Sequence, residues 1–339
     1  MSSKRVRARW WKHVGGQAVC LLCPRECRIN AGATGFCRMR RFAGDELITL
    51  TYGHPQGLAV DPIEKKPLYH FLPASDVLSF GTTGCTLACK FCQNWTLSQS
   101  MKSDEMGMIV EPAQIVELAK QKSAPMIAYT YNEPAIFGEY LIDVARLAHE
   151  AGIRNVMVSN GFIAPGAREE IMADIDAVNI DLKGFSERFY QTHTRGSLAP
   201  VLDTLVWVNK APHIWLEITT LLIPGLNDSD EMLAAEFDWI VDQLGLDVPL
   251  HLTAFHPDYQ MRDRSRTSSN ILTNAREIAI SKGLRYVYTG NVVNPEGQGT
   301  ICPSCGFTVM TRTWQRTGLE GLVGNTCASC GAVIAGVYK

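Results

Sequence analysis

The sequence predicts an α/β fold, in which a partial (β/α)6-type barrel of parallel strands carries a small cysteine-rich N-terminal extension and a C-terminal zinc ribbon. Between about residues 76 and 292, short apolar runs alternate with amphipathic stretches of helical length. Repeated units of this kind build either a barrel of parallel strands or an open doubly wound sheet. Polar residues gather directly after the apolar runs, at the face where the loops of parallel βα folds converge, and this favours the barrel. We therefore expect three segments, a cysteine-rich region over 1–75, the barrel over 76–297 and a ribbon over 298–339.

Seven strands and five helices are expected in the central segment. Several strands are nearly continuous apolar runs, which is typical of parallel strands buried on both faces. One helix places Ile136, Tyr140 and Val144 on a single stripe and stops at Gly152. The expected strands are 76–84, 126–134, 155–161, 177–184, 214–225, 250–258 and 285–292, and the expected helices are 111–122, 134–152, 165–175, 228–245 and 270–283.

The composition excludes several classes of protein. With 32 Lys and Arg against 34 Asp and Glu, the formal net charge is −2, which favours neither nucleic acid nor an anionic membrane as partner. No window approaches the 18 or so apolar residues of a membrane span, and no apolar segment follows the basic N-terminus as in a signal peptide. We expect a cytoplasmic protein with reduced thiols. Its 11 cysteines, set in three close groups, then indicate metal binding rather than disulfides.

The central cysteines lie in one short loop after the first expected strand. Cys85, Cys89 and Cys92 have the spacing CxxxCxxC. Three thiolates can bind three irons of a 4Fe–4S cubane and leave the fourth iron without a protein ligand, open to a substrate or cofactor. The alternative is a zinc site that lacks its fourth ligand.

This loop, with Phe91 just before its last cysteine, resembles the signature of radical S-adenosylmethionine (SAM) enzymes. The resemblance extends over residues 76–292, implies a TIM-like partial barrel, and is closest to the branch of pyruvate formate-lyase-activating enzymes. In that family the open iron binds SAM, and an electron from the cluster cleaves it to methionine and a 5′-deoxyadenosyl radical. The resemblance implies that Cys85, Cys89 and Cys92 are catalytic, and that Phe91 lies near the adenine; its alternative role is core packing. It also implies an external electron donor of the flavodoxin or ferredoxin type.

Two further motifs, which lie at the carboxyl ends of the next two expected strands, also resemble elements of this family. Asn132-Glu133-Pro134 stands where the family has Gly-Gly-Glu-Pro, which implies that Asn132 and Glu133 bind the methionine amino group. Ser159-Asn160-Gly161 resembles the Thr-Asn-Gly element near the cofactor, although an exposed Asn-Gly is more often a turn.

The later strand ends add weaker matches. Asp181-Leu182-Lys183 resembles an Asp-Leu-Lys element that contacts the polar end of SAM, with a strand-end ion pair as the alternative. His256 resembles the histidine near the ribose, with a loop-capping role as the alternative. One departure concerns Val158, since the activases have an Asp there that helps to hold a monovalent cation. That cation site is therefore in doubt.

The flanking cysteines form two closed sets of four. Cys302, Cys305, Cys327 and Cys330 make two CxxC-Gly pairs, the pattern of a four-thiolate zinc site in a ribbon, with iron as the competing metal. Cys20, Cys23, Cys27 and Cys37 lie within 18 residues, and both zinc and a second 4Fe–4S cluster fit them.

The whole chain resembles the radical enzyme of the three-component set called AmmeMemoRadiSam, on three features. These are the Cys-x2-Cys-Pro-x2-Cys element that begins at Cys20, the Tyr-Asn-Glu-Pro motif that ends at Pro134, and a ribbon ending in residues 335–338. The resemblance implies association with Memo-type and AMMECR-type proteins. The main hypothesis is a radical SAM enzyme that abstracts hydrogen from a substrate, a protein segment included. The alternatives are a glycyl-radical-enzyme activase and an inactive metal-stabilised scaffold.

Overall fold

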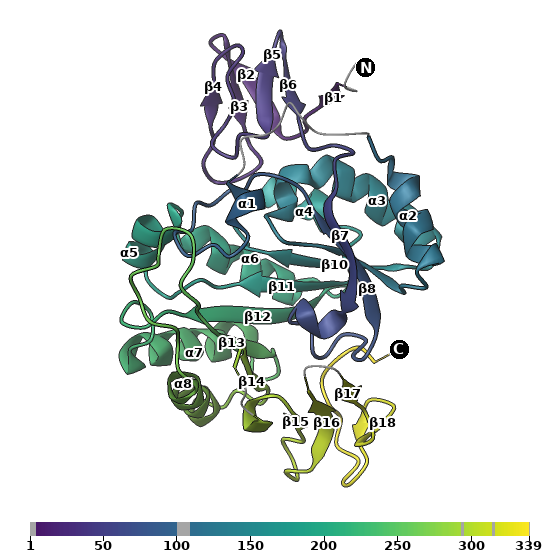
Figure 1. The fold of residues 1–339 in the computed structure, drawn as a ribbon, viewed down its shortest axis with the longest axis vertical. Coiled ribbons are helices and arrows are strands. Elements are labelled where there is room, and N and C mark those ends of the chain that lie inside the picture. Colours follow the sequence, from purple (N-terminus) through teal and green to yellow (C-terminus); the bar gives the residue numbers. More distant parts are fainter. Residues whose placement is uncertain (1–4, 100–108, 293–294, 314–315, 339) are drawn as a thin grey trace.

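The centre of the molecule is an eight-stranded sheet, shown in Figure 1. The computed structural model describes residues 5–99, 109–292, 295–313 and 316–338. The strands of the sheet are β7 (Gln56–Pro62), β8 (Asp76–Gly81), β9 (Met126–Tyr129), β10 (Arg154–Ser159), β11 (Ala177–Asp181), β12 (Trp215–Leu222), β13 (Leu250–Ala254) and β14 (Val287–Gly290). They lie side by side in chain order.

The strands from β8 to β14 are parallel, each hydrogen-bonded to the next along the chain. All seven expected strands are thereby confirmed. The eighth strand, β7, pairs antiparallel with β8 and was not expected, because Pro55 and Pro62 make its sequence look like loop. Within the described residues β7 and β14 form the two edges of the sheet, so the sheet is open.

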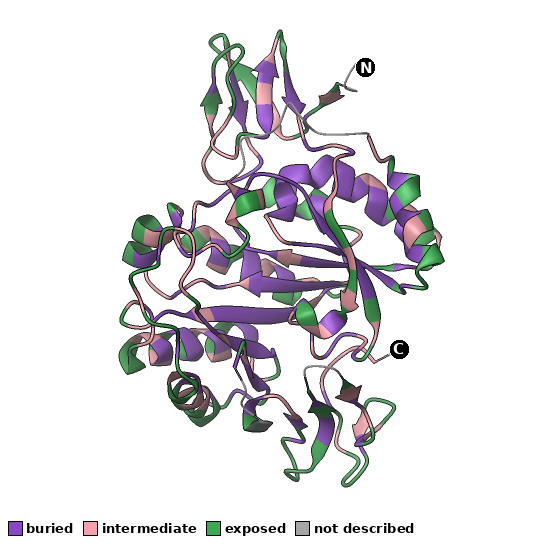
Figure 2. Cartoon of the chain, viewed as in Figure 1, coloured by how far each residue is buried: buried purple, intermediate pink, exposed green. Residues whose placement is uncertain are grey.

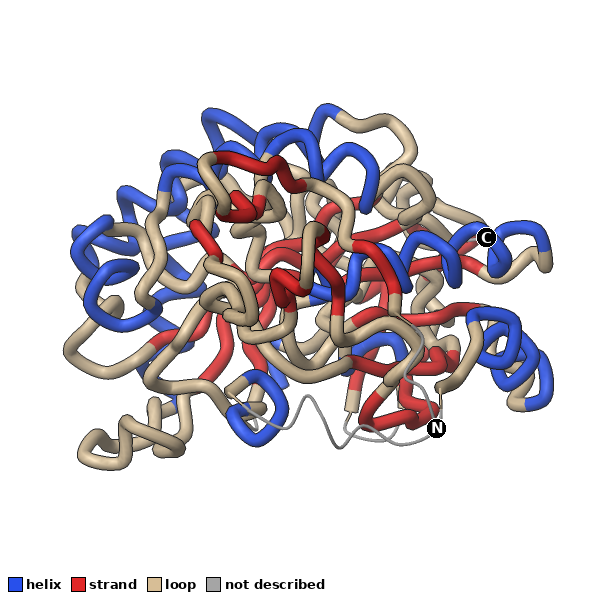
Figure 3. Tube along the Cα trace, turned by 90° about the horizontal axis from the view of Figure 1, so that it is seen from above, coloured by secondary structure: helices blue, strands red, loops and turns tan. Residues whose placement is uncertain are grey.

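Helices cover the outer side of the strands, as the view from above shows (Figure 3). Successive helices contact one another, from α2 to α4 and from α6 to α8. The five expected helices are confirmed, although the second is divided into a 3-10 turn and α3. Helix α6 is not among the helices expected from the sequence. The helical elements are α1 (Trp95–Ser98), α2 (Pro112–Gln121), η2 (Pro134–Phe137), α3 (Gly138–Glu150), α4 (Pro165–Ile171), α5 (Glu187–Phe189), the π-turn η3 (Tyr190–Thr194), α6 (Ala199–Lys210), α7 (Asp230–Leu244) and α8 (Ser269–Ser281), with the 3-10 turns η1 (Ile63–Lys65) and η4 (Pro295–Gly297).

The core lies between these helices and the sheet, where strands β8 to β14 are almost entirely buried (Figure 2). Strand β9 is buried at every position, and β10 and β11 are buried except at their ends and Val158. Such continuous burial explains the unbroken apolar runs of the sequence. Ser229 and Ser268 begin α7 and α8 by accepting hydrogen bonds from the backbone N–H groups of Met232 and Ile271, which fixes where these helices start.

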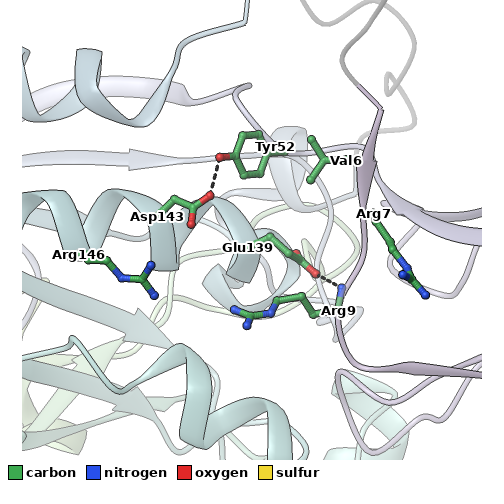
Figure 4. Close-up of a pocket in the computed structure, with 7 residues that line it drawn as sticks. All are labelled: Val6, Arg7, Arg9, Tyr52, Glu139, Asp143 and Arg146. Atoms are coloured by element: carbon green, nitrogen blue, oxygen red, sulfur yellow. Dashed lines mark hydrogen bonds between the residues drawn. The ribbon is translucent and has the colours of Figure 1, made fainter.

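The N-terminal region contains two small antiparallel sheets at one end of the molecule (Figure 1). Their strands are β1 (Val6–Arg7), β5 (Arg40–Ala43) and β6 (Glu46–Thr49) in one sheet, and β2 (Trp11–Val14), β3 (Gln17–Cys20) and β4 (Arg28–Ile29) in the other. This region is joined to α3: the backbone N–H of Arg9 donates to Glu139 at 2.7 Å, and the hydroxyl of Tyr52 donates to Asp143 at 2.5 Å (Figure 4). Both contacts fix the N-terminal sheets against the central domain.

The C-terminal unit lies at the opposite end (Figure 1). It has the three-stranded sheet β15 (Thr300–Ile301), β16 (Thr308–Arg312) and β17 (Thr317–Gly318), and the hairpin β18 (Leu322–Val323) and β19 (Thr326–Cys327). Its buried residues pack on Tyr286 and Tyr288 next to and within β14. Backbone hydrogen bonds of Val337 with His70 and Leu72 tie the end of the chain to the segment before β8.

No helix among the described residues is long and apolar enough to cross a lipid bilayer.

Candidate active site at the carboxyl ends of the strands

The loop of Cys85, Cys89 and Cys92 follows β8 at the carboxyl end of the sheet. It is held in place by η3, because the backbone N–H groups of Ala88 and Lys90 donate to the carbonyls of Thr194 and His193 at 2.8 and 2.9 Å. Cys89 is buried, and the other two cysteines are half-buried. The loop therefore presents three thiols from a fixed backbone.

Polar groups already surround these sulfurs. The Cys85 sulfur receives the backbone N–H of Leu87 at 3.5 Å and the side-chain amide of Asn160 at 3.6 Å. The Cys92 sulfur lies 3.2 Å from the hydroxyl oxygen of Ser98. Hydrogen bonds to sulfur stabilise the thiolate form and tune the potential of an iron–sulfur cluster.

The spacing of the three sulfurs also fits a cluster rather than one ion. Among the described residues, the four C-terminal cysteines are the only group of three or more metal-ligating side chains whose ligand atoms all lie within 4.8 Å of one another. The sulfurs of Cys85, Cys89 and Cys92 therefore do not all lie within that distance. Thiolates around one zinc lie about 3.8 Å apart, as a tetrahedron of about 2.3 Å bonds requires. The residues present thus fit an iron–sulfur cluster held by three thiolates.

Glu133 is a buried carboxylate beside this loop. It accepts the hydroxyl of Ser159 at 2.9 and 3.1 Å, the backbone N–H of Asn160 at 2.8 Å and that of Ala135 at 3.1 Å. Burial raises the pKa of Glu133 to about 7, although these donors partly oppose the shift. A positively charged ligand group would lower this pKa again, so Glu133 is suited to bind an ammonium.

The sequence motifs at β9 and β10 therefore act together. Ser159 and Asn160, at the end of β10, orient Glu133, which follows β9. Asn160 in addition reaches the cysteine loop, where its amide donates to Thr86 at 3.1 Å. The structure brings Glu133, Ser159, Asn160 and Cys85 into one connected group.

Asn132 has a different set of partners from that expected. Its side-chain amide donates to the carbonyl of Gly84 at 2.8 Å and its side-chain oxygen accepts the backbone N–H of Thr82 at 3.0 Å. Both partners belong to the start of the cysteine loop. In this structure the side chain of Asn132 fixes that loop.

Asp181 and Lys183 form an ion pair of 2.8 Å at the end of β11. Burial opposes the charge of Lys183, but the electrostatic interactions with Asp181 and the nearby Cys89 outweigh it, so the pKa of Lys183 is raised. The side-chain amide of Asn227, which follows β12, donates to the carbonyl of Lys183 at 3.1 Å. Lys183 is thus a fixed cation beside the cysteine loop, whichever ligand binds there.

Phe91 lies in the core, whereas His256 lies at the surface. Phe91 is buried and its ring centre is 6.0 Å from that of Phe189, so it packs in the core in this structure. His256 is exposed two residues beyond β13, and its Nδ1 lies 3.0 Å from the carbonyl of Pro257. It lines a small cavity of about 280 Å³ together with Gln93, Arg266 and Asn291. Arg266 and Asn291 carried no signal in the sequence.

The C-terminal cysteines form a compact group. The sulfurs of Cys302 and Cys330 lie 3.7 Å apart, as do those of Cys305 and Cys327. All four lie within 4.8 Å of one another. These distances match a single tetrahedral metal ion, as in a four-thiolate zinc site.

The chain is similar to known proteins over the region that contains this site. The family model described as the Radical SAM superfamily matches residues 80–237, which include the cysteine loop and the ends of β9 to β12. An uncharacterized protein of Methanocaldococcus jannaschii is 42% identical over 294 residues, 86% of this chain and 87% of that protein. The pyruvate formate-lyase-activating enzyme of Clostridium pasteurianum is 26% identical over 152 residues, 44% of this chain and 62% of that enzyme.

Among solved structures, a radical SAM methyltransferase from Sphaerobacter thermophilus is similar with a TM-score of 0.50. The match covers 65% of this chain and 67% of that chain at 14% identity. At this identity the likeness concerns the fold.

Proposed function

Because this chain belongs to the radical SAM superfamily and is an enzyme of radical chemistry, we propose that Cys85, Cys89 and Cys92 hold a 4Fe–4S cluster whose open iron binds SAM. When bound, the cluster supplies the electron that cleaves SAM to methionine and a 5′-deoxyadenosyl radical, which abstracts hydrogen from the substrate. The observation that supports this most is the connection of the cysteine loop to Glu133 through Asn160.

Each site residue has a role in this proposal. Glu133 binds the ammonium of SAM, and Ser159 and Asn160 hold its carboxylate in place. Lys183, paired with Asp181, faces the carboxylate end of SAM as a fixed cation. Asn132 acts through the loop backbone rather than by touching SAM. Phe91 and His256 remain proposed contacts of the adenine and the ribose.

The test is the formation of 5′-deoxyadenosine. Anaerobically reconstituted protein with dithionite and SAM should release it, and Cys85→Ala should abolish the release. Cys302→Ala is a matched control, since it removes a thiol at the other end of the molecule and should leave the release in place. Equal release by wild type and Cys85→Ala would contradict the proposal.

We propose a protein segment as substrate, in keeping with the similarity to an enzyme that activates pyruvate formate-lyase. Within the AmmeMemoRadiSam set, Memo-type and AMMECR-type proteins are the proposed partners, and a flavodoxin or ferredoxin the electron donor. Anaerobic pull-down with purified Memo-type and AMMECR-type proteins tests the partnership. Binding of neither would argue against membership of that set.

A glycyl-radical-enzyme activase is the second candidate, favoured by the same similarity. Electron paramagnetic resonance of a partner protein after incubation with SAM distinguishes it, because an activase leaves a glycyl radical in the partner. Val158, where activases have an Asp, makes this outcome less expected.

The remaining features of the proposal concern the architecture. We propose that the open sheet is a partial TIM-like barrel and that Cys302, Cys305, Cys327 and Cys330 bind zinc in a ribbon, which metal analysis tests. The reduced thiols that all these sites need are typical of the cytoplasm, where we propose that the protein works.

A further inference from the structure

The four N-terminal cysteines belong to a well-ordered loop system between β3 and β5. Cys20 ends β3, and its backbone N–H donates to the carbonyl of Cys27 at 3.0 Å. The sulfur of Cys27 in turn accepts the backbone N–H of Phe36 at 3.4 Å, next to Cys37. Cys20 and Cys23 are buried, while Cys27 and Cys37 are half-buried. These hydrogen bonds hold the loops that carry the four thiols against one another.

The spacing of these sulfurs separates them from the C-terminal set. The C-terminal thiols stand at the 3.7 Å pair distance of a single tetrahedral ion. Among the described cysteines of the N-terminal set, no three have their sulfurs within 4.8 Å of one another. The sulfurs of Cys85, Cys89 and Cys92, the three thiols of the radical SAM signature, likewise do not all lie within 4.8 Å of one another. In the distances between its sulfur atoms, the N-terminal set thus resembles the three proposed cluster ligands and differs from the compact C-terminal group.

Positive charge lies beside these thiols. One compensating charge is Arg40, which is fully buried and interacts electrostatically with Cys20 and Cys37. Its Nε has no hydrogen-bond partner. A buried cation beside four thiols, two of them buried and two half-buried, is expected where a negatively charged metal–thiolate centre forms.

The N-terminal set also lies directly against the central cysteine loop. A Cβ on Gly84 would be 2.6 Å from the carbonyl oxygen of Cys37, so the backbones of Cys37 and Gly84 are in contact. Since Gly84 precedes Cys85, the Cα atoms of Cys37 and Cys85 are within roughly 10 Å of each other. The N-terminal set therefore borders the loop that carries the radical SAM signature.

Arg25 connects the same two groups of cysteines. Its Nε donates to the carbonyl of Thr86 at 2.7 Å, next to Cys85. Its guanidinium lies 3.6 Å from the ring centre of Phe36, next to Cys37. It interacts electrostatically with Cys23, Cys27 and Cys85. A single side chain therefore lies between both groups of thiols.

We propose that Cys20, Cys23, Cys27 and Cys37 bind a second 4Fe–4S cluster, which lies beside the cluster of Cys85, Cys89 and Cys92 with Arg25 between the two. The N-terminal region is then a redox module next to the SAM site rather than a zinc-stabilised appendage. This inference goes beyond the proposed function and does not depend on cleavage of SAM.

The test compares iron and zinc in three variants of the full chain, reconstituted anaerobically with iron, sulfide and an equimolar amount of zinc. The central variant, C85A/C89A/C92A, leaves the N-terminal set intact. The N-terminal variant, C20A/C23A, removes two of its thiols. The matched control, C302A/C305A, removes two thiols from the single-ion site. Size-exclusion chromatography and circular dichroism verify that each variant is folded.

We expect about eight irons per chain in the wild type and about four in the central variant, with the absorption of a 4Fe–4S cluster and, after dithionite, its electron paramagnetic resonance signal. The control should keep all its iron. If the N-terminal variant fails to fold, the central variant still decides, because its N-terminal ligands are unchanged. The proposal is overturned if the iron content of the central variant falls to near zero, with or without zinc in its place. It is also overturned if the iron bound by the central variant is not accompanied by acid-labile sulfide.

These outcomes are separate from those of the proposed function. A central variant that keeps its iron supports the second cluster even if the wild type releases no 5′-deoxyadenosine. Conversely, a wild type that cleaves SAM while its central variant is free of iron retains the proposed function and loses the second cluster.

Discussion

Arg40 of the N-terminal sheets and Glu139 of α3 form a buried ion pair, in which one guanidinium nitrogen donates to both carboxylate oxygens at 2.7 and 2.9 Å. The two residues are 99 positions apart in the chain. Glu139 also accepts the backbone N–H of Arg9 at 2.7 Å. One carboxylate therefore connects the N-terminal sheets to the central domain, close to the thiols of Cys20 and Cys37.

Glu139→Ala should destabilise the protein by about 3 kcal/mol, because it leaves the Arg40 guanidinium buried without its counter-ion. Chemical denaturation under anaerobic conditions measures this change. Asp238→Ala is the matched control, since Asp238 pairs at 2.8 Å with Lys282 but is about half exposed. The control should change stability by less than about 0.5 kcal/mol. Equal losses for both variants would contradict a structural role of the buried pair.

Gly84→Ala should disrupt the contact between the two groups of cysteines. Gly84 has φ of 86°, which a residue with a side chain rarely adopts, and a Cβ there would be 2.6 Å from both the Cys37 carbonyl oxygen and the Met39 side chain. We expect loss of at least half of the bound iron and of 5′-deoxyadenosine release. Iron analysis and the release assay measure these effects.

Gly166→Ala is the control for that substitution. Gly166 lies in the first turn of α4, has no atom within 4 Å of an added Cβ and has no positive φ. Iron content should stay at the wild-type value, and stability should rise by up to about 1 kcal/mol. If Gly84→Ala behaves like Gly166→Ala, the close packing of Cys37 on Gly84 does not matter for the metal sites.

Much of the central fold could be predicted from the sequence because buried parallel strands leave an unmistakable signal. Several of the apolar runs that became β9 to β14 are nearly continuous, and polar residues follow them at the carboxyl end of the sheet. Helix α6 was missed because Thr204 and Asn209 interrupt its apolar pattern, although Pro200 in its first turn was an available start signal. The N-terminal strands are two to four residues long, too short for any periodicity to appear.

The residues of the candidate site could be predicted where a sequence motif specifies their chemistry. They could not be predicted where contacts with residues distant in the chain determine where a side chain lies. The spacing of Cys85, Cys89 and Cys92 points to one loop irrespective of the fold. By contrast, Asn132 faces the cysteine loop because of hydrogen bonds with Thr82 and Gly84, two residues some fifty positions away. No pattern within the motif reveals such partners. Arg25 was missed for the same reason.

The pKa of Glu133 predicts a pH dependence of SAM binding. The ammonium of SAM binds the ionised carboxylate, whereas at pH below about 7 the buried carboxyl is protonated. We therefore expect the affinity for SAM to fall about tenfold between pH 7.5 and pH 6. Isothermal titration calorimetry of reconstituted protein measures it. Glu133→Gln should bind SAM weakly and without this pH dependence, and a retained dependence would assign it to another group.

The same pKa affects the stability of the protein without SAM. Because the folded-state pKa of Glu133 is raised from 4.5 to about 7, the folded state binds the proton more tightly than the unfolded state does. The contribution of Glu133 to stability is full below about pH 4.5 and is lost as the pH rises through about 7. Denaturation of wild type and Glu133→Gln at pH 6 and 8 should show that the variant loses less stability over this interval.

Cys327→Ser should remove one metal ion and loosen only the C-terminal unit. Cys327 is buried in the small core that also contains Cys302, Tyr288 and Ile334. This core holds few side chains, so we expect a metal bound by the four cysteines to supply much of the stability of the unit. Inductively coupled plasma mass spectrometry should show one zinc fewer per chain with the iron unchanged.

Limited proteolysis should then cut Cys327→Ser within residues 298–338 faster than the wild type, while the central sheet resists. The loosening should stay within the C-terminal unit, because the backbone hydrogen bond between Val337 and His70 joins the end of the chain to the segment before β8 without the metal. Ser304→Ala, between Cys302 and Cys305 and exposed, is the matched control and should be cut at the wild-type rate. Loss of iron together with zinc in Cys327→Ser would contradict the independence of the two metal centres.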